Sequence, residues 1–177
     1  MTRRYVILGN GIAGQTCAEE LRMLDSECSI TMVAAEPHPL YNRVALPRYL
    51  RGQVRREKVF MRTVESYAAK GIEIQFDTRA LEVDPQRKVV TTDKDQELPY
   101  DALLVATGGR PKPAPWPTVD VARDETYGFQ TIDDTDMIID RSDAVGTVLV
   151  IGGSFITYEF AEAVSYRQHA KVDWLMC

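Results

Sequence analysis

The chain has 177 residues, of which 21 are Lys or Arg and 26 are Asp or Glu, giving a formal net charge of −5. Hydrophobic residues make up 45% and charged residues 27%, a mixture typical of a soluble globular protein, so disordered and fibrous classes are excluded. The acidic balance argues against a nucleic-acid partner, because binding a phosphate backbone calls for a basic face. The longest apolar runs have about five or six residues against the ~20 that a membrane span needs, so no membrane segment is predicted.

Cysteine and histidine usage indicates the compartment and argues against a metal site. Cys17, Cys28 and Cys177 form no close pair. An odd, sparse set of this kind is typical of a reducing compartment, so we expect a cytoplasmic protein without a disulfide framework. His38 and His169 stand alone, with no Cys/His cluster around them, so no metal site is predicted.

Hydrophobic periodicity predicts that the chain begins with a βαβ unit. Residues 5–8 form an apolar run that ends at glycine, and residues 29–35 are rich in β-branched side chains, so both are predicted strands. Between them, apolar residues recur at helical spacing over 12–24. Two strands joined by a helix within about 30 residues imply parallel pairing and a right-handed crossover.

The stretch that follows is predicted to hold one more helix and several strands. Residues 38–48 contain Pro39 and Pro47 and are predicted to form an irregular loop. The turn at Asp84-Pro85 predicts a β-hairpin or meander around it. The predicted elements are a helix over 61–70, ending at Gly71, and strands over 72–76, 80–83, 88–92 and 101–106.

A proline-rich segment predicts the domain boundary. Four prolines between residues 111 and 117 make this segment stiff and extended. Beyond it, a second βαβ unit begins and is expected to be incomplete; its predicted elements are a helix over 133–141, a strand over 147–151, a helix over 155–168 and a strand over 171–176. The predicted organisation is a first domain over 1–110, a linker over 111–117 and a partial second domain over 118–177, all of the α/β class.

Residues 9–14 read Gly-Asn-Gly-Ile-Ala-Gly, a G-x-G-x-x-G pattern between a predicted strand and a predicted helix. Gly9 permits the tight turn, Gly11 lets the backbone approach a pyrophosphate, and Gly14 lets the helix pack close to the sheet. Glu36 follows Gly14 by 22 residues, at the end of the second predicted strand, where a carboxylate accepts hydrogen bonds from ribose hydroxyls. These residues predict a dinucleotide-binding site.

The first turn of the predicted helix supplies the other half of such a site. The backbone N–H groups of Ile12 and Ala13 and the positive end of the helix dipole are expected to face the phosphates. The alternative is a glycine-rich strand–helix turn that binds nothing.

The sequence resembles the N-terminal part of the FAD-dependent pyridine nucleotide-disulphide oxidoreductases, flavoproteins with two dinucleotide-binding domains. Among them it is most similar to nitrite reductase flavin subunits, rubredoxin reductases and NADH oxidases. Residues 5–36, 41–48 and 98–111 carry the resemblance, which continues more weakly over 147–163. It implies a three-layer, Rossmann-like FAD-binding domain with a β-meander, followed by an incomplete NAD-binding βαβ unit.

Residues 41–48 read Tyr-Asn-Arg-Val-Ala-Leu-Pro-Arg and resemble the family's Y-x-R-x-x-L loop. The resemblance implies that Arg43 lies against the FAD pyrophosphate or ribose, that Pro47 lines the approach to the flavin, and that Arg48 lies near the isoalloxazine ring. A cation suits this place because the flavin diphosphate carries two negative charges. Pro47 departs from the family, which usually has serine there; the alternative for both arginines is a solvated loop.

Residues 98–111 resemble the second flavin signature of the family, a strand that ends in Ala-Thr-Gly. The resemblance implies that the backbone of Ala106, Thr107 and Gly108 comes close to the flavin diphosphate. It also suggests that the backbone of Ala80 reads the adenine edge.

The resemblance departs from the family at the second glycine pattern, which would bind NAD(P)H. Gly152 and Gly153 are present, but Ser154 and Thr157 replace the second and third glycines of the pattern. Ser154 adds a side chain where a backbone should meet pyrophosphate, and Thr157 adds bulk between helix and strand. Glu159 matches a glutamate that relatives place near the flavin–nicotinamide interface; its alternative is an ordinary helix-face carboxylate.

The resemblance implies an NAD(P)H-dependent oxidoreductase that passes hydride from nicotinamide to FAD and electrons onward to an acceptor, such as an electron-transfer protein. No catalytic acid or base is predicted, since flavin hydride transfer need not use one. Relatives continue into segments that complete the flavin site. The chain is therefore expected to be a piece of a longer protein, a subunit completed by a partner chain or another copy, or a remnant. The alternative function is a nucleotide-binding or subunit-interaction protein that holds FAD, ADP or AMP without turnover.

Overall fold

The computed structural model describes residues 2–111, 126–142, 145–168 and 170–176, and its contacts divide the chain into two compact units. Unit 1 comprises residues 1–41 and 60–109, and unit 2 comprises residues 42–59 and 110–177. The contacts therefore assign residues 42–59 differently from the single boundary near residue 110 that the sequence predicts. Most of the predicted proline linker, from residue 112 to 117, lies outside the described residues, as do His169 and Cys177.

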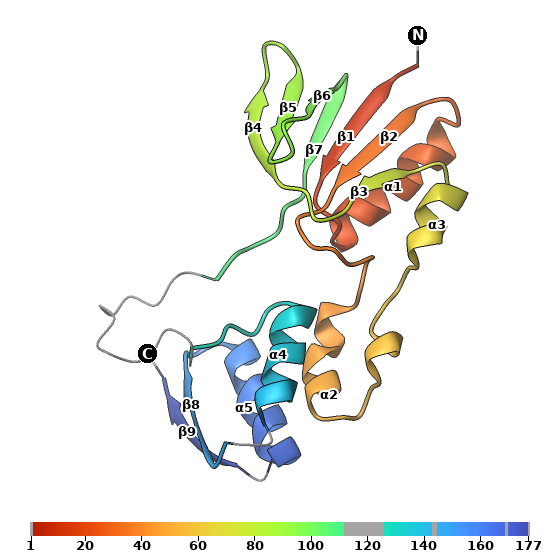
Figure 1. The fold of residues 1–177 in the computed structure, drawn as a ribbon. Helices are drawn as coiled ribbons and strands as arrows, with labels where there is room; N and C mark the ends of the chain where they lie inside the picture. The colour runs from red at the N-terminus through yellow and green to blue at the C-terminus, as the bar shows by residue number, and fades with distance from the viewer. Residues whose placement is uncertain (1, 112–125, 143–144, 169, 177) are drawn as a thin grey trace. The chain divides into compact units, whose positions relative to one another are not determined.

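Unit 1 is built on a four-stranded parallel sheet in the order β3-β2-β1-β7 (Figure 1). The central strand β1 pairs with β2 on one side and β7 on the other, so Tyr5 lies opposite both Ile30 and Ala102. The βαβ unit predicted from the sequence is present. The elements are β1 (Arg4–Leu8), α1 (Ile12–Leu24), β2 (Ser29–Val33), α3 (Val64–Ala69), β3 (Glu73–Gln75) and β7 (Ala102–Val105).

A separate antiparallel meander of three strands follows β3. It consists of β4 (Ala80–Asp84), β5 (Val89–Thr92) and β6 (Glu97–Pro99), in that spatial order. The sequence predicted the first two strands but missed β6, which has only three residues and ends at a proline. Proline is tolerated there because β6 lies at the edge of its sheet.

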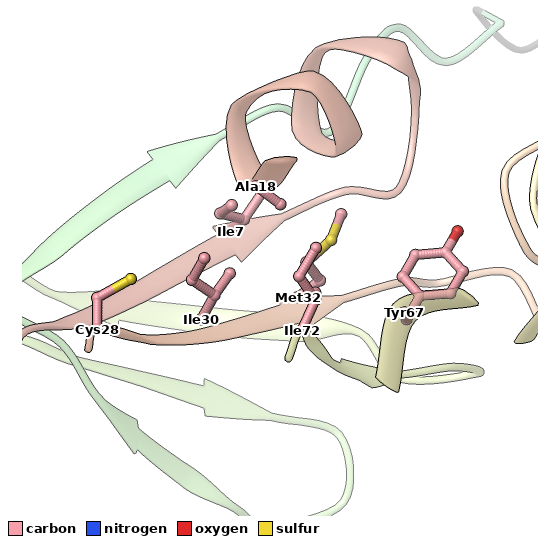
Figure 2. Packing of buried hydrophobic residues seen from close by; sticks show 7 residues of the cluster. All are labelled: Ile7, Ala18, Cys28, Ile30, Met32, Tyr67 and Ile72. Carbon is pink, nitrogen blue, oxygen red and sulfur yellow. The ribbon is translucent and has the colours of Figure 1, made fainter. Parts of the chain in front are cut away.

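Successive side chains of β1 point to opposite faces of the sheet, so the core of unit 1 consists of two clusters, one on each face. Unit 1 therefore has three layers: helices, the parallel sheet and the meander. Ile7 faces a cluster that includes Ala18 of α1 and Tyr67 of α3 (Figure 2). Its neighbours Val6 and Leu8 face the other side and join a cluster with residues of the meander. The buried members of the first cluster are Ile7, Ala18, Cys28, Ile30, Met32, Tyr67 and Ile72, and those of the second are Val6, Leu8, Val33, Val90 and Tyr100.

Unit 2 contains a two-stranded parallel sheet and the helices that pack with it. Strands β8 (Thr147–Ile151) and β9 (Lys171–Leu175) pair over five residues and are connected by α5 (Phe155–Gln168). Helix α4 (Ile132–Ser142) precedes β8. Among the described residues, no helix of either unit is long and apolar enough to cross a membrane.

The predicted irregular loop over 38–48 is wrong in its second part, because a short helix α2 spans Leu46–Leu50. It lies between two 3-10 turns, η1 (Arg43–Ala45) and η2 (Arg56–Lys58). Pro47 falls in the first turn of α2, where its missing N–H costs no helical hydrogen bond. Leu50 is fully buried in a cluster with residues of α4 and α5. Helix α2 lies beside these two helices, and this segment therefore belongs to unit 2 (Figure 1).

Candidate dinucleotide-binding site

Three predicted segments meet at the carboxyl ends of adjacent strands in unit 1. The glycine loop of residues 9–14 follows β1, Glu36 lies three residues beyond β2, and residues 106–108 follow β7. The Gly9 N–H donates to the Val33 carbonyl at 2.8 Å, and the Ala106 N–H donates to the Leu8 carbonyl at 2.8 Å. Parallel sheets bind ligands at this edge, where connections leave a central strand in opposite directions.

Each glycine of the first pattern meets a different steric requirement. Gly9 has φ +113°, and a Cβ there would lie 2.2 Å from the carbonyl oxygen of Ala106. A Cβ on Gly14 would lie 2.1 Å from the carbonyl oxygen of Gly9, so only glycine lets α1 approach this closely. A Cβ on Gly11 would meet nothing within 4 Å. No contact within unit 1 therefore requires glycine at position 11, and the space beside Gly11 is open.

The N-terminus of α1 opens toward that space. Gly11 is the N-cap residue, and no side chain caps the helix. Ile12 and Ala13, which follow it, are exposed. The first N–H groups of a helix without a side-chain cap are available to an anion, and the helix dipole favours negative charge there. The loop and helix thus fit the diphosphate of a dinucleotide.

The carboxylate predicted to bind ribose is held by a neighbouring tyrosine. The hydroxyl of Tyr41 donates to Glu36 Oε2 at 2.6 Å, and Tyr41 is itself buried. Its ring makes an edge contact with Phe60 at 6.2 Å between centroids. Packing therefore fixes the tyrosine, and the tyrosine fixes the orientation of the carboxylate.

A buried polar network, which the sequence analysis missed, ties the glycine loop to the segment after Glu36. The hydroxyl of Tyr67 accepts from the Leu40 N–H and donates to Asn10 Oδ1, both at 2.9 Å. Asn10 in turn donates from Nδ2 to the carbonyl of His38 at 3.2 Å. Burial raises the pKa of the Tyr67 phenol, so it remains a donor at neutral pH. No sequence pattern pairs positions 10 and 67.

The segment predicted to read adenine lies beside the end of β2. The Thr78 N–H donates to the carbonyl of Ala34 at 2.9 Å, and Ala80 opens β4 two residues later. Gly108, at the end of the Ala-Thr-Gly segment, has φ +70°, and Thr107 is exposed. The contacts of Ala80, Ala106, Thr107 and Gly108 with a flavin nucleotide remain predictions.

Three other predicted residues belong to unit 2. Arg43 donates from Nη1 to the carbonyl of Gln130 at 2.8 Å, Pro47 is buried in α2, and Arg48 is exposed. Unit 1 therefore does not contain them. Their roles beside a flavin remain predictions based on the resemblance.

The second glycine pattern lies in unit 2, between β8 and α5. Gly152 has φ +137°, as the tight turn requires, and Glu159 is partly buried on α5. Ser154 and Thr157 contact each other, with their hydroxyl oxygens 3.0 Å apart. In the described part of the chain, no group of three or more His, Cys, Asp and Glu residues could hold a metal ion.

A family model for pyridine nucleotide-disulphide oxidoreductases matches residues 3–175. The chain belongs to this family. The match spans both units, so the glycine loop and the Ser154 loop both lie within it. The family predicted from the three sequence stretches is thereby confirmed.

The chain is similar to curated proteins that are named as a reductase or as an electron transfer subunit. The chain is 32% identical over 172 residues to the assimilatory nitrate reductase electron transfer subunit of Bacillus subtilis, covering 97% of this chain and 22% of that protein. It is 32% identical over 170 residues to putidaredoxin reductase CamA of Pseudomonas putida, covering 94% of this chain and 40% of that protein. The chain thus spans less than half the length of these relatives.

Solved structures confirm the fold. Putidaredoxin reductase in its covalent complex with putidaredoxin has a TM-score of 0.86 at 29% identity, covering 98% of this chain and 42% of that one. Reduced CoADR-RHD of Bacillus anthracis has a TM-score of 0.91 at 25% identity, covering 99% of this chain and 33% of that one. The α/β class with a parallel, Rossmann-like sheet is as predicted.

Proposed function

We propose that this chain is the FAD-binding part of an oxidoreductase that passes electrons through the flavin to an acceptor. The observation that carries the proposal is the arrangement of glycines at the carboxyl ends of β2, β1 and β7. Gly9 and Gly14 are required by contacts within the protein, whereas Gly11 is required by none. Gly11 is also the N-cap of α1, which has no side-chain cap, so a ligand can approach the backbone closely at the open end of this helix.

The residues of unit 1 then have distinct tasks. The N–H groups at the start of α1 bind the diphosphate, and Glu36, oriented by Tyr41, accepts hydrogen bonds from the adenosine ribose. The backbone of residues 106–108, which follows β7 on the other side of β1, would help to hold the diphosphate. FAD supplies the redox chemistry when bound, and the protein supplies binding and orientation.

The names of relatives suggest which class of electron acceptor the flavin reduces. One relative is named as an electron transfer subunit of nitrate reductase, and a solved neighbour is complexed with putidaredoxin. These names support a protein or protein-bound centre as the acceptor of the flavin electrons.

The test is FAD binding by the purified chain, with Gly11→Ala as the informative variant. We expect about one equivalent of FAD to bind and to be released on denaturation. A Cβ at Gly11 meets no protein atom, so Gly11→Ala should fold normally but bind FAD at least about tenfold more weakly, or roughly 1.4 kcal/mol. Gly128→Ala is the matched control, because its Cβ also meets nothing and it lies in unit 2. Equal FAD affinity of the two variants would contradict the proposal.

A second candidate function is nucleotide binding without turnover, and one observation favours it. The first glycine pattern is intact, but the second has Ser154 and Thr157 in place of glycines. ADP and FAD binding separate the two candidates. Binding of ADP with an affinity equal to that of FAD would indicate that only the adenosine diphosphate half is held.

A further inference from the structure

The chain contains the same loop twice, so one loop can be compared with the other inside one molecule. Gly9, Gly11 and Gly14 of the first pattern correspond to Gly152, Ser154 and Thr157 of the second. Both loops follow a parallel strand and open a helix, α1 in unit 1 and α5 in unit 2. The first residue of each has a positive φ, +113° at Gly9 and +137° at Gly152. Both loops therefore begin with a glycine in a conformation that side chains rarely adopt, and they differ at the second and third glycine positions of the pattern.

The third position of the pattern sets how closely the helix approaches the turn. In unit 1 a Cβ on Gly14 would lie 2.1 Å from the carbonyl oxygen of Gly9, so no side chain fits. Thr157, at the corresponding place in unit 2, carries a whole side chain. Its Oγ1 lies 2.7 Å from where a Cβ of Gly152 would be. Helix α5 must therefore stand farther from its turn than α1 does, and the threonine fills the gap.

The second position decides whether the helix N-terminus is open. Gly11 offers no side chain, and α1 has no side-chain cap. Ser154, by contrast, accepts at Oγ from the Thr157 N–H at 3.3 Å, and its hydroxyl lies 3.0 Å from Thr157 Oγ1. A serine that accepts from the N–H three residues later is a helix N-cap, and it occupies a donor that an anion would otherwise use. The α5 terminus is thus closed by its own side chains.

We infer that Ser154 and Thr157 are specificity-determining residues that prevent unit 2 from holding the pyrophosphate of a nicotinamide dinucleotide at the N-terminus of α5. The hydroxyl of Ser154 stands in for the anion, and the bulk of Thr157 keeps the helix away from the turn. The residues present in unit 2 do not fit NAD(P)H, whereas those in unit 1 fit FAD. This inference rests on the proposed function, in which the chain binds FAD. The chain then binds FAD and rejects the nicotinamide nucleotide.

Backbone amide NMR of the 15N-labelled chain, with NADH and NADPH as the probes, tests the inference. We expect no chemical-shift change at the amides of residues 152–157 with either nucleotide at millimolar concentration. The variant Ser154→Gly/Thr157→Gly should show shifts there and at least a tenfold gain in affinity. Shifts at these amides in the unaltered chain would overturn the inference, as would equal affinities of the chain and the double-glycine variant.

The double variant Ser154→Ala/Thr157→Ala is the matched control. It removes both hydroxyls but keeps a Cβ at each position, so we expect it to gain less affinity than the double-glycine variant. An equal gain would overturn the role given to the bulk of Thr157. If the double-glycine variant does not fold, Ser154→Gly alone opens the cap, and a gain smaller than threefold would overturn the role given to Ser154.

FAD binding is measured on the same samples. Because it depends on unit 1, loss of FAD binding in all of them would contradict the proposed function. The shifts at residues 152–157 would still report separately on the α5 terminus.

Discussion

Tyr67 illustrates how one buried hydroxyl holds two functional segments together. Its ring belongs to the first core cluster, and its hydroxyl points away from Met32 and Ile72 (Figure 2). The hydroxyl bonds Asn10 of the glycine loop and Leu40 beyond Glu36. The separation between the segments proposed to bind phosphate and ribose therefore depends on this oxygen.

Replacing Tyr67 by Phe keeps the ring but leaves the buried Leu40 N–H without its acceptor. An unsatisfied buried donor costs about 1–3 kcal/mol, so we expect that loss in the free energy of unfolding of unit 1. FAD affinity should also fall, by roughly tenfold, which corresponds to about 1.4 kcal/mol. Denaturant titration and FAD titration measure the two effects, with the exposed Tyr166→Phe as control.

A double-mutant test distinguishes a role of Tyr67 in positioning Asn10 from a role in stability alone. If Tyr67 acts through Asn10, Tyr67→Phe should weaken FAD binding far less in an Asn10→Ala background than in the unaltered chain. Additive losses of FAD affinity would assign Tyr67 a structural role only.

At the scale of elements, Glu19 fastens α1 to the segment that carries α3. Its Oε1 accepts from Lys70 Nζ at 2.6 Å and from Arg62 Nε at 3.0 Å. Gln15, one turn earlier on α1, donates to the same oxygen at 2.8 Å. Hydrogen bonds from Arg62 and then Lys70 lower the pKa of Glu19 to about 2 from an ordinary 4.5.

The lowered pKa of Glu19 predicts how the stability of unit 1 depends on pH. A carboxyl with a depressed folded-state pKa stabilises the fold above its unfolded pKa, and this contribution is lost as pH falls through the folded value. The Glu19 contribution should therefore be complete above about pH 5 and disappear toward pH 2. Glu19→Gln should flatten the dependence in this window and remove roughly 1 kcal/mol at neutral pH, a figure reduced for solvent screening.

Urea titrations from pH 2 to 7 compare Glu19→Gln with Glu20→Gln, an exposed carboxylate on the same helix. We expect only the Glu19 variant to alter the slope of unfolding free energy against pH between about 2 and 5. An unchanged slope in that variant would show that the ion pairs with Arg62 and Lys70 do not stabilise unit 1.

At the scale of the whole molecule, two sequence segments make unit 2. The segment 42–59 is joined to the rest of the unit by polar contacts as well as by packing. Asp136 of α4 accepts from the Tyr49 hydroxyl at 2.6 Å and from Arg56 Nε at 2.8 Å. Burial, followed by the bond to Asp136, raises the pKa of Tyr49 to about 12. Arg51 forms an ion pair with Glu162 of α5.

Leu50→Ala tests the division of the chain into units. Leu50 is fully buried among α4 and α5, so the substitution should cost unit 2 about 2–5 kcal/mol. The stability of unit 1 should stay unchanged. Hydrogen exchange at α5 amides measures the first effect and hydrogen exchange at β1 amides the second. Val44→Ala, exposed in the same segment, should change neither; a loss of protection in β1 equal to that in α5 would contradict the division.

Local patterns allowed much of this structure to be predicted. The bounds of α1, β8 and α5 were predicted to the residue, because each segment has residue types that suit its element and is followed by a glycine or a polar residue. The glycine loop and Glu36 could also be predicted, because their spacing is fixed by one strand–helix–strand unit. Helix α2 was missed because its five residues are too few to show a period, and two prolines nearby suggested a loop.

The sequence by itself determined the family, the fold class and the identity of the two glycine patterns, because these depend on residue types at short spacing. Only the tertiary structure decided that Tyr67 meets Asn10, that residues 42–59 pack with α4 and α5, and that Ser154 and Thr157 close the end of α5. These facts depend on which distant surfaces come into contact and how closely a helix approaches its turn. Such distances follow from the packing of the whole unit and leave no periodic trace in the chain.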